Sequence, residues 1–182
     1  MNAPVQTFLP ISKLKISITA PDPAVAPDSQ ILIYTDGACI GNPGPGGWAC
    51  VIQRIADGVV IKERILSGAV TTETTNNRME MEAVIAALLQ VRKGEKAPVT
   101  IRSDSQIVVK GMNEWMAKWQ AKGWKVAGGK PVSNRDLWEQ ILAVAEDKTI
   151  TWVWVKGHAG DPLNEKVDGL AAAAARAAMV PA

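Results

Sequence analysis

The spacing of apolar residues changes along the chain, and this change restricts most strongly the folds that the chain can adopt. Segments rich in Val and Ile, which have the character of strands, come first, at 31–35, 48–55 and 59–66. Asp57-Gly58 separates the second segment from the third and is a hairpin turn signal. From 77 to 92 the apolar residues instead recur at the spacing of a helix. The patterned part of the chain, from residue 31 onward, is therefore expected to start with three neighbouring strands, and helices follow only afterwards.

The second half of the chain alternates between helix and strand patterns. Its expected elements are a strand at 99–103, a helical segment at 105–116, a helix from Ser133 to about Glu146, a strand at 149–155 and a last helix that starts at Asp161 or Asn164. Ser133 followed by Asp136 has the spacing of a capping box. The order βββαβα(α)βα predicts an α/β fold in which helices pack on the faces of a five-stranded mixed sheet.

The chain has 182 residues, enough for one domain of ordinary size with some chain to spare. Residues 1–29 contain five prolines and little periodicity, which predicts an extended or disordered N-terminal tail. We therefore expect one folded domain at 30–182. The residues of the tail point to no particular partner.

Composition excludes several classes of protein. Hydrophobic residues make up 47% of the chain and charged residues 21%, as in globular proteins, and no apolar run is long enough for a membrane helix. The net charge of +2 indicates no polyanionic partner by itself. Cys39 and Cys50 form no CxxC pair and His158 is the only histidine, which leaves metals bound by oxygen ligands. Because the N-terminus lacks a secretion signal, we expect a cytoplasmic protein.

Four carboxylates occupy positions from which they can meet. Asp36 and Asp104 each follow a predicted strand, Glu80 lies in the first turn of a predicted helix, and Asp168 lies within the last helix. Clustered carboxylates repel one another unless protons or cations compensate, and Mg²⁺ prefers oxygen ligands. These residues could therefore share a metal site. Taken singly, each also has an ordinary structural explanation: Asp36 as a turn residue, Glu80 as a charge at a helix N-terminus, Asp104 as an N-cap and Asp168 as a solvated helix residue.

Tryptophan and basic residues are concentrated in one segment. Four of the seven tryptophans lie within it, at Trp115, Trp119, Trp124 and Trp138. Residues 117–135 contain five basic residues and no acidic one. Basic side chains neutralise phosphates, and aromatic rings pack on sugars or bases, so the segment could bind nucleic acid. A helical hairpin with core tryptophans and a solvated lysine face explains the same pattern equally well.

Five ordered blocks of sequence closely resemble bacterial ribonuclease H type I. They are YTDGACIGNPGPGGWA (34–49), TTNNRMEMEA (74–83), SDSQ (103–106), VKGHAG (155–160) and NEKVDGLA (164–171). The resemblance covers about residues 30–178, and the Trp-rich segment at about 115–138 looks like the basic helical handle of that family. It implies a ribonuclease H-like fold with a five-stranded mixed sheet and helices on both faces.

The resemblance also implies a reaction and the residues that carry it out. Asp36, Glu80, Asp104 and Asp168 fall where the family has its metal-binding carboxylates, and His158 falls on its mobile catalytic histidine. The implied activity is endonucleolytic hydrolysis of the RNA strand of RNA–DNA hybrids, giving 3′-hydroxyl and 5′-phosphate ends. Two Mg²⁺ ions, for which Mn²⁺ can substitute, would stand at the scissile phosphate. His158 would shuttle a proton or help release the product.

The substrate-binding residues implied by the resemblance form three groups. Those along the strand tracks, including the RNA strand, are Gly37, Cys39, Asn42, Asn76 and Gln106. Those beside the DNA strand are Asn77, Trp115, Trp119 and Trp138. Those of a pocket for a DNA phosphate are Thr75 and Asn134. Alternatively, these are turn and packing residues, and Trp138 in particular could be buried with Ile141 and Leu142.

Two departures from the family pattern concern affinity. Glu73 lies where some members have an arginine beside the DNA phosphate, and a carboxylate there should weaken that contact. Gly128, Gly129 and Ser133 make the handle less basic. We therefore expect modest hybrid affinity with a strong dependence on salt.

Two other functions compete with a monomeric ribonuclease H. A non-catalytic module that binds hybrids would need no intact catalytic set, and the presence of all four acids and the histidine argues against it. An integrase- or transposase-like nuclease on the same fold would need a different acidic triad and domains that bind DNA ends. The length of the chain argues against the second alternative.

Overall fold

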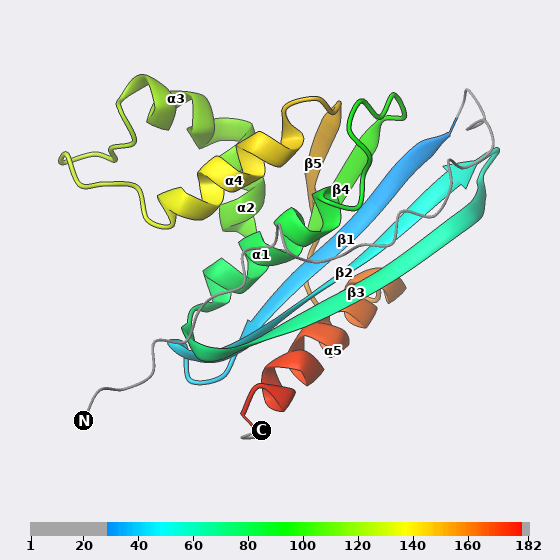
Figure 1. Ribbon diagram of the computed structural model, residues 1–182, viewed down its shortest axis with the longest axis horizontal. Coiled ribbons are helices and arrows are strands. Elements are labelled where there is room, and N and C mark those ends of the chain that lie inside the picture. The colour runs from blue at the N-terminus through cyan, green and yellow to red at the C-terminus, as the bar shows by residue number, and fades with distance from the viewer. Residues whose placement is uncertain (1–28, 180–182) are drawn as a thin grey trace.

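A computed structural model describes residues 29–179, so the predicted tail lies outside the described residues except for Ser29 (Figure 1). The strands are β1 (Gln30–Cys39), β2 (Gly44–Ala56), β3 (Val59–Thr74), β4 (Val99–Ser103) and β5 (Ile150–Trp154). The helices are α1 (Asn76–Leu88), α2 (Gln106–Lys110), the π-helical turn η2 (Gly111–Trp115), α3 (Met116–Ala121), α4 (Arg135–Ala145) and α5 (Pro162–Ala177). Among these residues, no helix is both long and apolar enough to cross a bilayer.

The five strands form one mixed sheet in the order β3-β2-β1-β4-β5, which confirms the predicted fold class. Strands β1, β2 and β3 are antiparallel neighbours, whereas β4 runs parallel to β1 and β5 parallel to β4. Figure 1 shows α1 and α4 on one face of the sheet and α5 on the other. Because β1 and β4 are adjacent and parallel, the residues at their C-terminal ends come out at the same edge.

Each face of the sheet has its own apolar core, since successive side chains of a strand point to opposite faces. Ile33 of β1 packs with Ile101 of β4 and Val84 of α1 under the helices of the first face. Tyr34 packs with Val167 and Ala171 of α5 on the second face. The small residues of α5 let it lie close to the sheet.

At Gly47 of β2, α5 lies very close to the sheet. A Cβ at this position would collide with the backbone of Ala171 and Ala175. The alanines at 171 and 175 are themselves buried. A glycine on the strand and alanines on the helix therefore set the spacing of this layer.

The start of α4 differs from the prediction. Its N-cap is Asn134, in the left-handed region with φ 56°, and no side chain caps the helix. The capping box expected from Ser133 and Asp136 is wrong, because the Asp136 carboxylate instead accepts from the guanidinium of Arg78 on α1, at 2.7 and 3.1 Å. A partner from a distant part of the chain has replaced the local one.

The predicted handle joins the body of the molecule through a row of tryptophans. Trp119 lies between Trp115 and Trp138, with ring centroids 5.6 and 5.4 Å apart. Trp138 is only 2% exposed, and its ring fills the space above Gly111 in η2, where a Cβ would collide with it. This burial agrees with the alternative in which Trp138 packs in the core. The structure therefore corrects the assignment of Trp138 to a surface beside the DNA strand. Trp115 and Trp119 remain partly accessible.

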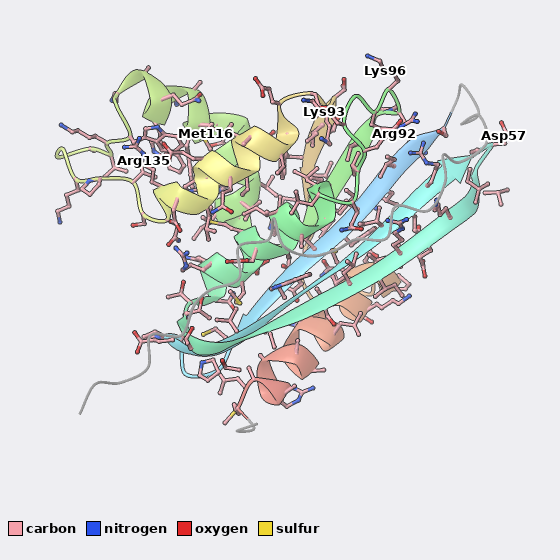
Figure 2. The ribbon with its side chains drawn as sticks, in the orientation of Figure 1. Asp57, Arg92, Lys93, Lys96, Met116 and Arg135 are labelled. Carbon is pink, nitrogen blue, oxygen red and sulfur yellow. The ribbon has the colours of Figure 1, made fainter. Side chains whose placement is uncertain are left out.

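The loop between α3 and α4 forms the outer part of the handle, and Figure 1 shows it standing away from the sheet. Lys125 and Pro131 form an isolated antiparallel bridge within it. The guanidinium of Arg135 lies 5.3 Å from the ring centroid of Trp124. Figure 2 shows Arg135 at this end of the molecule and Asp57 at the opposite end, in the β2–β3 hairpin.

Candidate active site

Three of the predicted carboxylates converge at the shared end of β1 and β4. Asp36 lies in β1, which continues past it to Cys39, and Asp104 follows the last residue of β4. Glu80 comes from α1, whose backbone rests on Gly37, since a Cβ there would collide with it. One carboxylate oxygen from each acid lies within 4.8 Å of the other two. The structure therefore assembles a compact acidic group from two strands and a helix.

Two carboxyls of this group, those of Asp36 and Glu80, are buried and have raised pKa values. Asp36 is 7% exposed and Glu80 is 5% exposed. Burial and then the charge of Asp104 raise the pKa of Asp36 to about 7, although the backbone N–H of Gly37 donates to it at 2.8 Å. Burial, followed by repulsion from Asp36 and Asp104, raises the pKa of Glu80 well above its usual value.

The acidic group fits a hard divalent cation. Its donors are all carboxylate oxygens, the ligands that Mg²⁺ and Mn²⁺ accept. Glu80 Oε2 is buried and has no hydrogen-bond partner among residues 29–179, so this oxygen is free to coordinate a cation. A bound cation would also relieve the repulsion that raises both pKa values.

Asp168 and His158 lie next to each other beside this group. His158 Nδ1 is 3.7 Å from Asp168 Oδ2, and the histidine side chain is 80% exposed. Asp168 does not belong to the compact group of three, but its charge contributes to the raised pKa of Asp36. The loop that carries His158 passes close to Asp104, because a Cβ on Gly157 would lie 2.7 Å from Asp104 Oδ2.

Two contacts to Asp104 come from residues that the sequence analysis did not assign to the site. The buried amide of Asn164 donates from Nδ2 to Asp104 Oδ2 at 3.4 Å. Trp154 at the end of β5 donates from Nε1 to the backbone carbonyl of Asp104 at 3.0 Å. Asn164 stands four residues before Asp168 and therefore on the same face of α5, a spacing that could have identified it.

Several predicted substrate-binding residues meet where β1, β2 and α1 come together. Asn42 Oδ1 accepts from the backbone N–H of Asn76 at 3.0 Å. The thiol of Cys39 is 3.4 Å from the backbone carbonyls of Gly44 and Thr74. Asn42, Asn76 and Cys39 thus line one loop region, next to Gly37 in β1. Gln106 stands apart from them, at the start of α2, two residues after Asp104.

The residues of the predicted phosphate pocket are linked through Arg78. Thr75 caps α1 by accepting from the backbone N–H of Arg78 at 3.4 Å. The Arg78 guanidinium donates from Nη1 to Asn134 Oδ1 at 3.3 Å. The sequence analysis did not name Arg78, whose link to Asn134 spans two helices. Asn77 lies between Thr75 and Arg78 in the sequence, in the first turn of α1.

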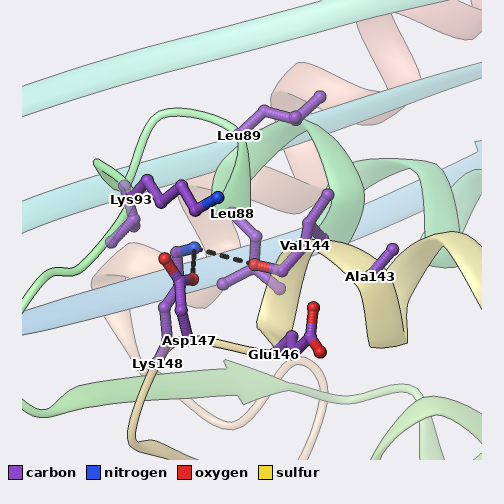
Figure 3. A pocket seen from close by; sticks show the side chains of 9 residues that line it. Leu88, Leu89, Lys93, Ala143, Val144, Glu146, Asp147 and Lys148 are labelled. Atoms are coloured by element: carbon purple, nitrogen blue, oxygen red, sulfur yellow. Dashed lines mark hydrogen bonds and ion pairs between the residues drawn. The ribbon is translucent and has the colours of Figure 1, made fainter.

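A separate pocket lies between the C-terminal ends of α1 and α4 (Figure 3). At its edge Lys148 Nζ donates to the carbonyl of Val144 at 2.8 Å and pairs with Asp147 at 2.6 Å. None of the predicted site residues lines this pocket. The chemistry suggested by the sequence is therefore at the acidic group and not in this cavity.

Comparison with known proteins identifies similar sequences and folds. Residues 28–176 match the family described as RNase H. A protein named Ribonuclease H from Polaromonas naphthalenivorans (strain CJ2) is 48% identical over 155 residues, which are 84% of this chain and 91% of that protein. The solved structure of LC9-RNase H1, called a type 1 RNase H with the type 2 active-site motif, has a TM-score of 0.73 and 32% identity, covering 85% of this chain and 75% of that one. LC11-RNase H1, solved in complex with an RNA/DNA hybrid, has a TM-score of 0.61 and 29% identity, covering 83% of this chain and 100% of that one.

Proposed function

Because the chain belongs to the RNase H family, we propose that it is an endonuclease that hydrolyses the RNA strand of RNA–DNA hybrids. The observation that carries the proposal is the convergence of Asp36, Glu80 and Asp104 at one edge of the sheet. The RNA/DNA hybrid held by LC11-RNase H1 supports the choice of substrate. We further propose that the products carry 3′-hydroxyl and 5′-phosphate ends and that the enzyme acts as a monomer.

The proposed cofactor is a pair of Mg²⁺ ions, which Asp36, Glu80, Asp104 and Asp168 would hold. When bound, such a pair activates the attacking water and stabilises charge on the leaving 3′-oxygen. These four side chains would hold the ions beside the scissile phosphate, and they offer only oxygen ligands. Because Asp36 has its pKa raised to about 7, its carboxyl gives up a proton as the cation binds near neutral pH.

His158 is proposed to move a proton during the reaction. Its imidazole is exposed, and Nδ1 faces the carboxylate of Asp168 at 3.7 Å. That carboxylate can orient the ring, and histidine is the side chain that most often transfers protons in enzymes. The glycines at 157 and 160 flank the histidine in its loop.

Substrate discrimination is proposed to depend on the 2′-hydroxyl of RNA, the group that distinguishes the two strands. Gly37, Cys39, Asn42, Asn76 and Gln106 are the residues proposed to follow the strands around the scissile phosphate. Asn77, Trp115 and Trp119 are proposed to contact the DNA strand, and Thr75 and Asn134 a DNA phosphate. Trp138 acts differently, by supporting the ring of Trp119 from the core at 5.4 Å.

Cleavage of an end-labelled RNA strand within an RNA–DNA hybrid tests the proposal. With Mg²⁺ present, we expect cleavage of the hybrid, no cleavage of RNA–RNA or DNA–DNA duplexes, and no cleavage by Asp36→Asn. Labelling the two ends of the RNA in turn identifies the product termini. If the wild-type chain retains the hybrid on a filter but leaves its RNA intact, the non-catalytic binding module replaces the nuclease.

A further inference from the structure

Asp161, the N-cap of α5, uses its two carboxylate oxygens for different purposes. Oδ1 accepts from the backbone N–H groups of Leu163 and Asn164 at 3.1 and 3.4 Å, as a helix cap does. Oδ2 accepts from the hydroxyl of Tyr34 at 2.7 Å and lies 3.9 Å from Nη1 of Arg102. The cap of α5 is therefore also bonded to the sheet.

Tyr34 and Arg102 occupy matching positions on the two strands that lead to the acidic group. They are register partners in the parallel pair β1 and β4. Tyr34 lies two residues before Asp36 in β1 and so shares a face of that strand with it. Arg102 lies two residues before Asp104, which directly follows the end of β4. Arg102 Nη1 donates to the Tyr34 hydroxyl at 2.8 Å, and its guanidinium lies 5.7 Å from the ring centroid.

Hydrogen bonds and charge favour a fixed arrangement of these three side chains, of which only Tyr34 is buried. Tyr34 is buried, and burial, followed by its hydrogen bond to Asp161, raises the pKa of its hydroxyl, which therefore stays a donor. Burial acts to raise the pKa of Asp161, but the bonds from Tyr34 and from the backbone of α5 outweigh it, so this pKa is lowered. At neutral pH the Tyr34 hydroxyl donates to the Asp161 carboxylate, and the Arg102 guanidinium donates to the Tyr34 hydroxyl.

The first turn of α5 controls the placement of three groups beside the acids. Asn164, three residues after the cap, donates to Asp104 at 3.4 Å. His158 sits in the loop that ends at the cap, with its backbone in the left-handed region at φ 51°. It pairs with Asp168, two turns into the same helix, at 3.7 Å. A displacement of this turn would move all three groups relative to the strands.

We propose that Tyr34, Arg102 and Asp161 are positioning residues that hold the first turn of α5 in register with the strands carrying Asp36 and Asp104. The inference rests on the proposed function, because it assigns these residues to the nuclease reaction. None of the three needs to touch the substrate. They act through the residues of α5 and of the loop before it.

Two substitutions break the network and spare the fold. Tyr34→Phe keeps the ring in the apolar core of α5 and removes only the hydroxyl. Asp161→Ser keeps a good N-cap but cannot reach Tyr34 or Arg102. Because displacements of about 1 Å at reacting groups cost up to about a hundredfold, we expect each variant to lower kcat on a hybrid by about tenfold. We expect KM to change by less than about twofold, because none of the proposed substrate contacts lies on α5 or in the loop before it.

The double variant and a matched control separate this role from general stability. Tyr34→Phe combined with Asp161→Ser should lower kcat about as much as either change alone, because both break the same bond. Glu63→Gln is the control, since Glu63 on β3 contacts Lys166 of α5 at 3.4 Å through an exposed ion pair outside the network. It should leave kcat unchanged. Tm is recorded for every variant to show that each is folded at the assay temperature.

The outcomes distinguish the inference from the function on which it rests. If wild-type protein cleaves the hybrid and both single variants keep kcat within about twofold, the positioning role is overturned and the nuclease stands. Additive losses in the double variant, or a rise in KM at unchanged kcat, also overturn it. If the wild-type chain cleaves no hybrid, the proposed function is overturned and the assignment of this network to catalysis with it.

Discussion

The carboxyls of Asp36 and Glu80 show how a single residue can oppose folding in order to serve a site. Both are buried, and their negative charges lie close to that of Asp104. Ionising them in the folded chain therefore requires more free energy than ionising them in the unfolded chain. A cation reverses this balance, so the folded state and the bound metal should stabilise each other.

The first prediction concerns the stability of the metal-free protein against pH. The pKa of Asp36 is about 7 when folded, against 3.8 when unperturbed. The folded state thus holds the proton longer, and the stability of wild type relative to Asp36→Asn should be highest below pH 3.8 and fall until about pH 7. From pH 4 to pH 8 we expect that difference in the free energy of unfolding to fall by roughly 3 kcal/mol.

Urea unfolding of both proteins in EDTA measures this difference. Adding Mg²⁺ at pH 8 should raise Tm of the wild type more than that of Asp36→Asn. A difference that stays flat or rises with pH would contradict the burial of an ionisable group at this position.

Glu95 shows how one buried charge can organise a whole connection, the loop from α1 to β4. Its side chain is 1% exposed and accepts from Arg54 at 2.6 Å and from Arg92 at 3.0 Å. The backbone N–H groups of Lys96 and Ala97 donate to its other oxygen at 3.0 Å each. Figure 2 shows Arg92 and Lys96 in this connection. Glu95 therefore joins the loop to β2 through Arg54.

The second prediction is that Glu95→Gln destabilises the protein in a pH-dependent way. Burial acts to raise the pKa of Glu95, but the N–H of Ala97 and the two arginines hold it at about 2, below the usual 4.5. Its contribution of about 3 kcal/mol is therefore present above pH 4.5 and is lost as the pH falls towards 2. Glu139→Gln, which breaks only the exposed pair with Arg135, should change the free energy of unfolding by less than about 1 kcal/mol. Equal effects from both variants in urea unfolding at pH 7 would refute the role of Glu95.

The third prediction concerns the packing of α5 on β2. Gly47→Ala should lower the free energy of unfolding by about 1–3 kcal/mol, because the added Cβ meets helix backbone that cannot yield by a rotamer change. Gly169→Ala within α5 should raise it by about 0.5–1 kcal/mol, since a Cβ there meets nothing within 4 Å. Thermal unfolding of both variants measures the contrast. A stabilising Gly47→Ala would show that α5 does not approach β2 so closely.

The elements that the sequence predicts well are those whose pattern is local. The Asp57-Gly58 turn, the helix at α1 and the short strands β4 and β5 follow from turn chemistry and periodicity alone. Strand β3 runs on to Thr74, beyond the expected residue 66, because pairing with β2 sustains it through Gly68 and Val70. Tertiary pairing of this kind has no signal in the strand's own residues.

Within the site, the same distinction separates what could be predicted from what could not. Asp36 lies near the C-terminal end of β1 and Asp104 directly follows β4, so the meeting of these two acids follows from the parallel pairing of the strands. Glu80 lies beyond the first turn of α1, the turn in which the sequence analysis had placed it. The sequence left two roles open for Trp138, and its contact with Gly111 decides between them. Asp136 was expected in a capping box, and its ion pair with Arg78 replaces that role. Such contacts between distant segments become visible only when the chain is folded.

At the scale of the whole molecule, the handle and the acidic group lie toward the same end of the sheet. Figure 1 shows the C-terminal end of β1, the start of α1 and the α3–α4 loop all on that side. The five basic residues at 117–135 therefore extend the proposed binding surface beyond the carboxylates, which themselves repel a phosphate backbone. We expect the handle to supply the electrostatic attraction that the acidic group lacks.

The last prediction tests whether this attraction resides in the handle or in the net charge. Lys118→Ala with Lys122→Ala removes two charges from the handle, and Lys93→Ala with Lys96→Ala removes two from the α1–β4 connection (Figure 2). Binding to a hybrid is measured in EDTA, so that no cleavage occurs, over a series of salt concentrations. Removing one lysine that neutralises a phosphate lowers the slope of log affinity against log salt by about 1, so the slope of the handle variant should fall by about 2 and its binding should weaken roughly tenfold. The second variant should stay within about twofold of wild type. Equal weakening in the two variants would show that net charge, and not the handle, attracts the hybrid.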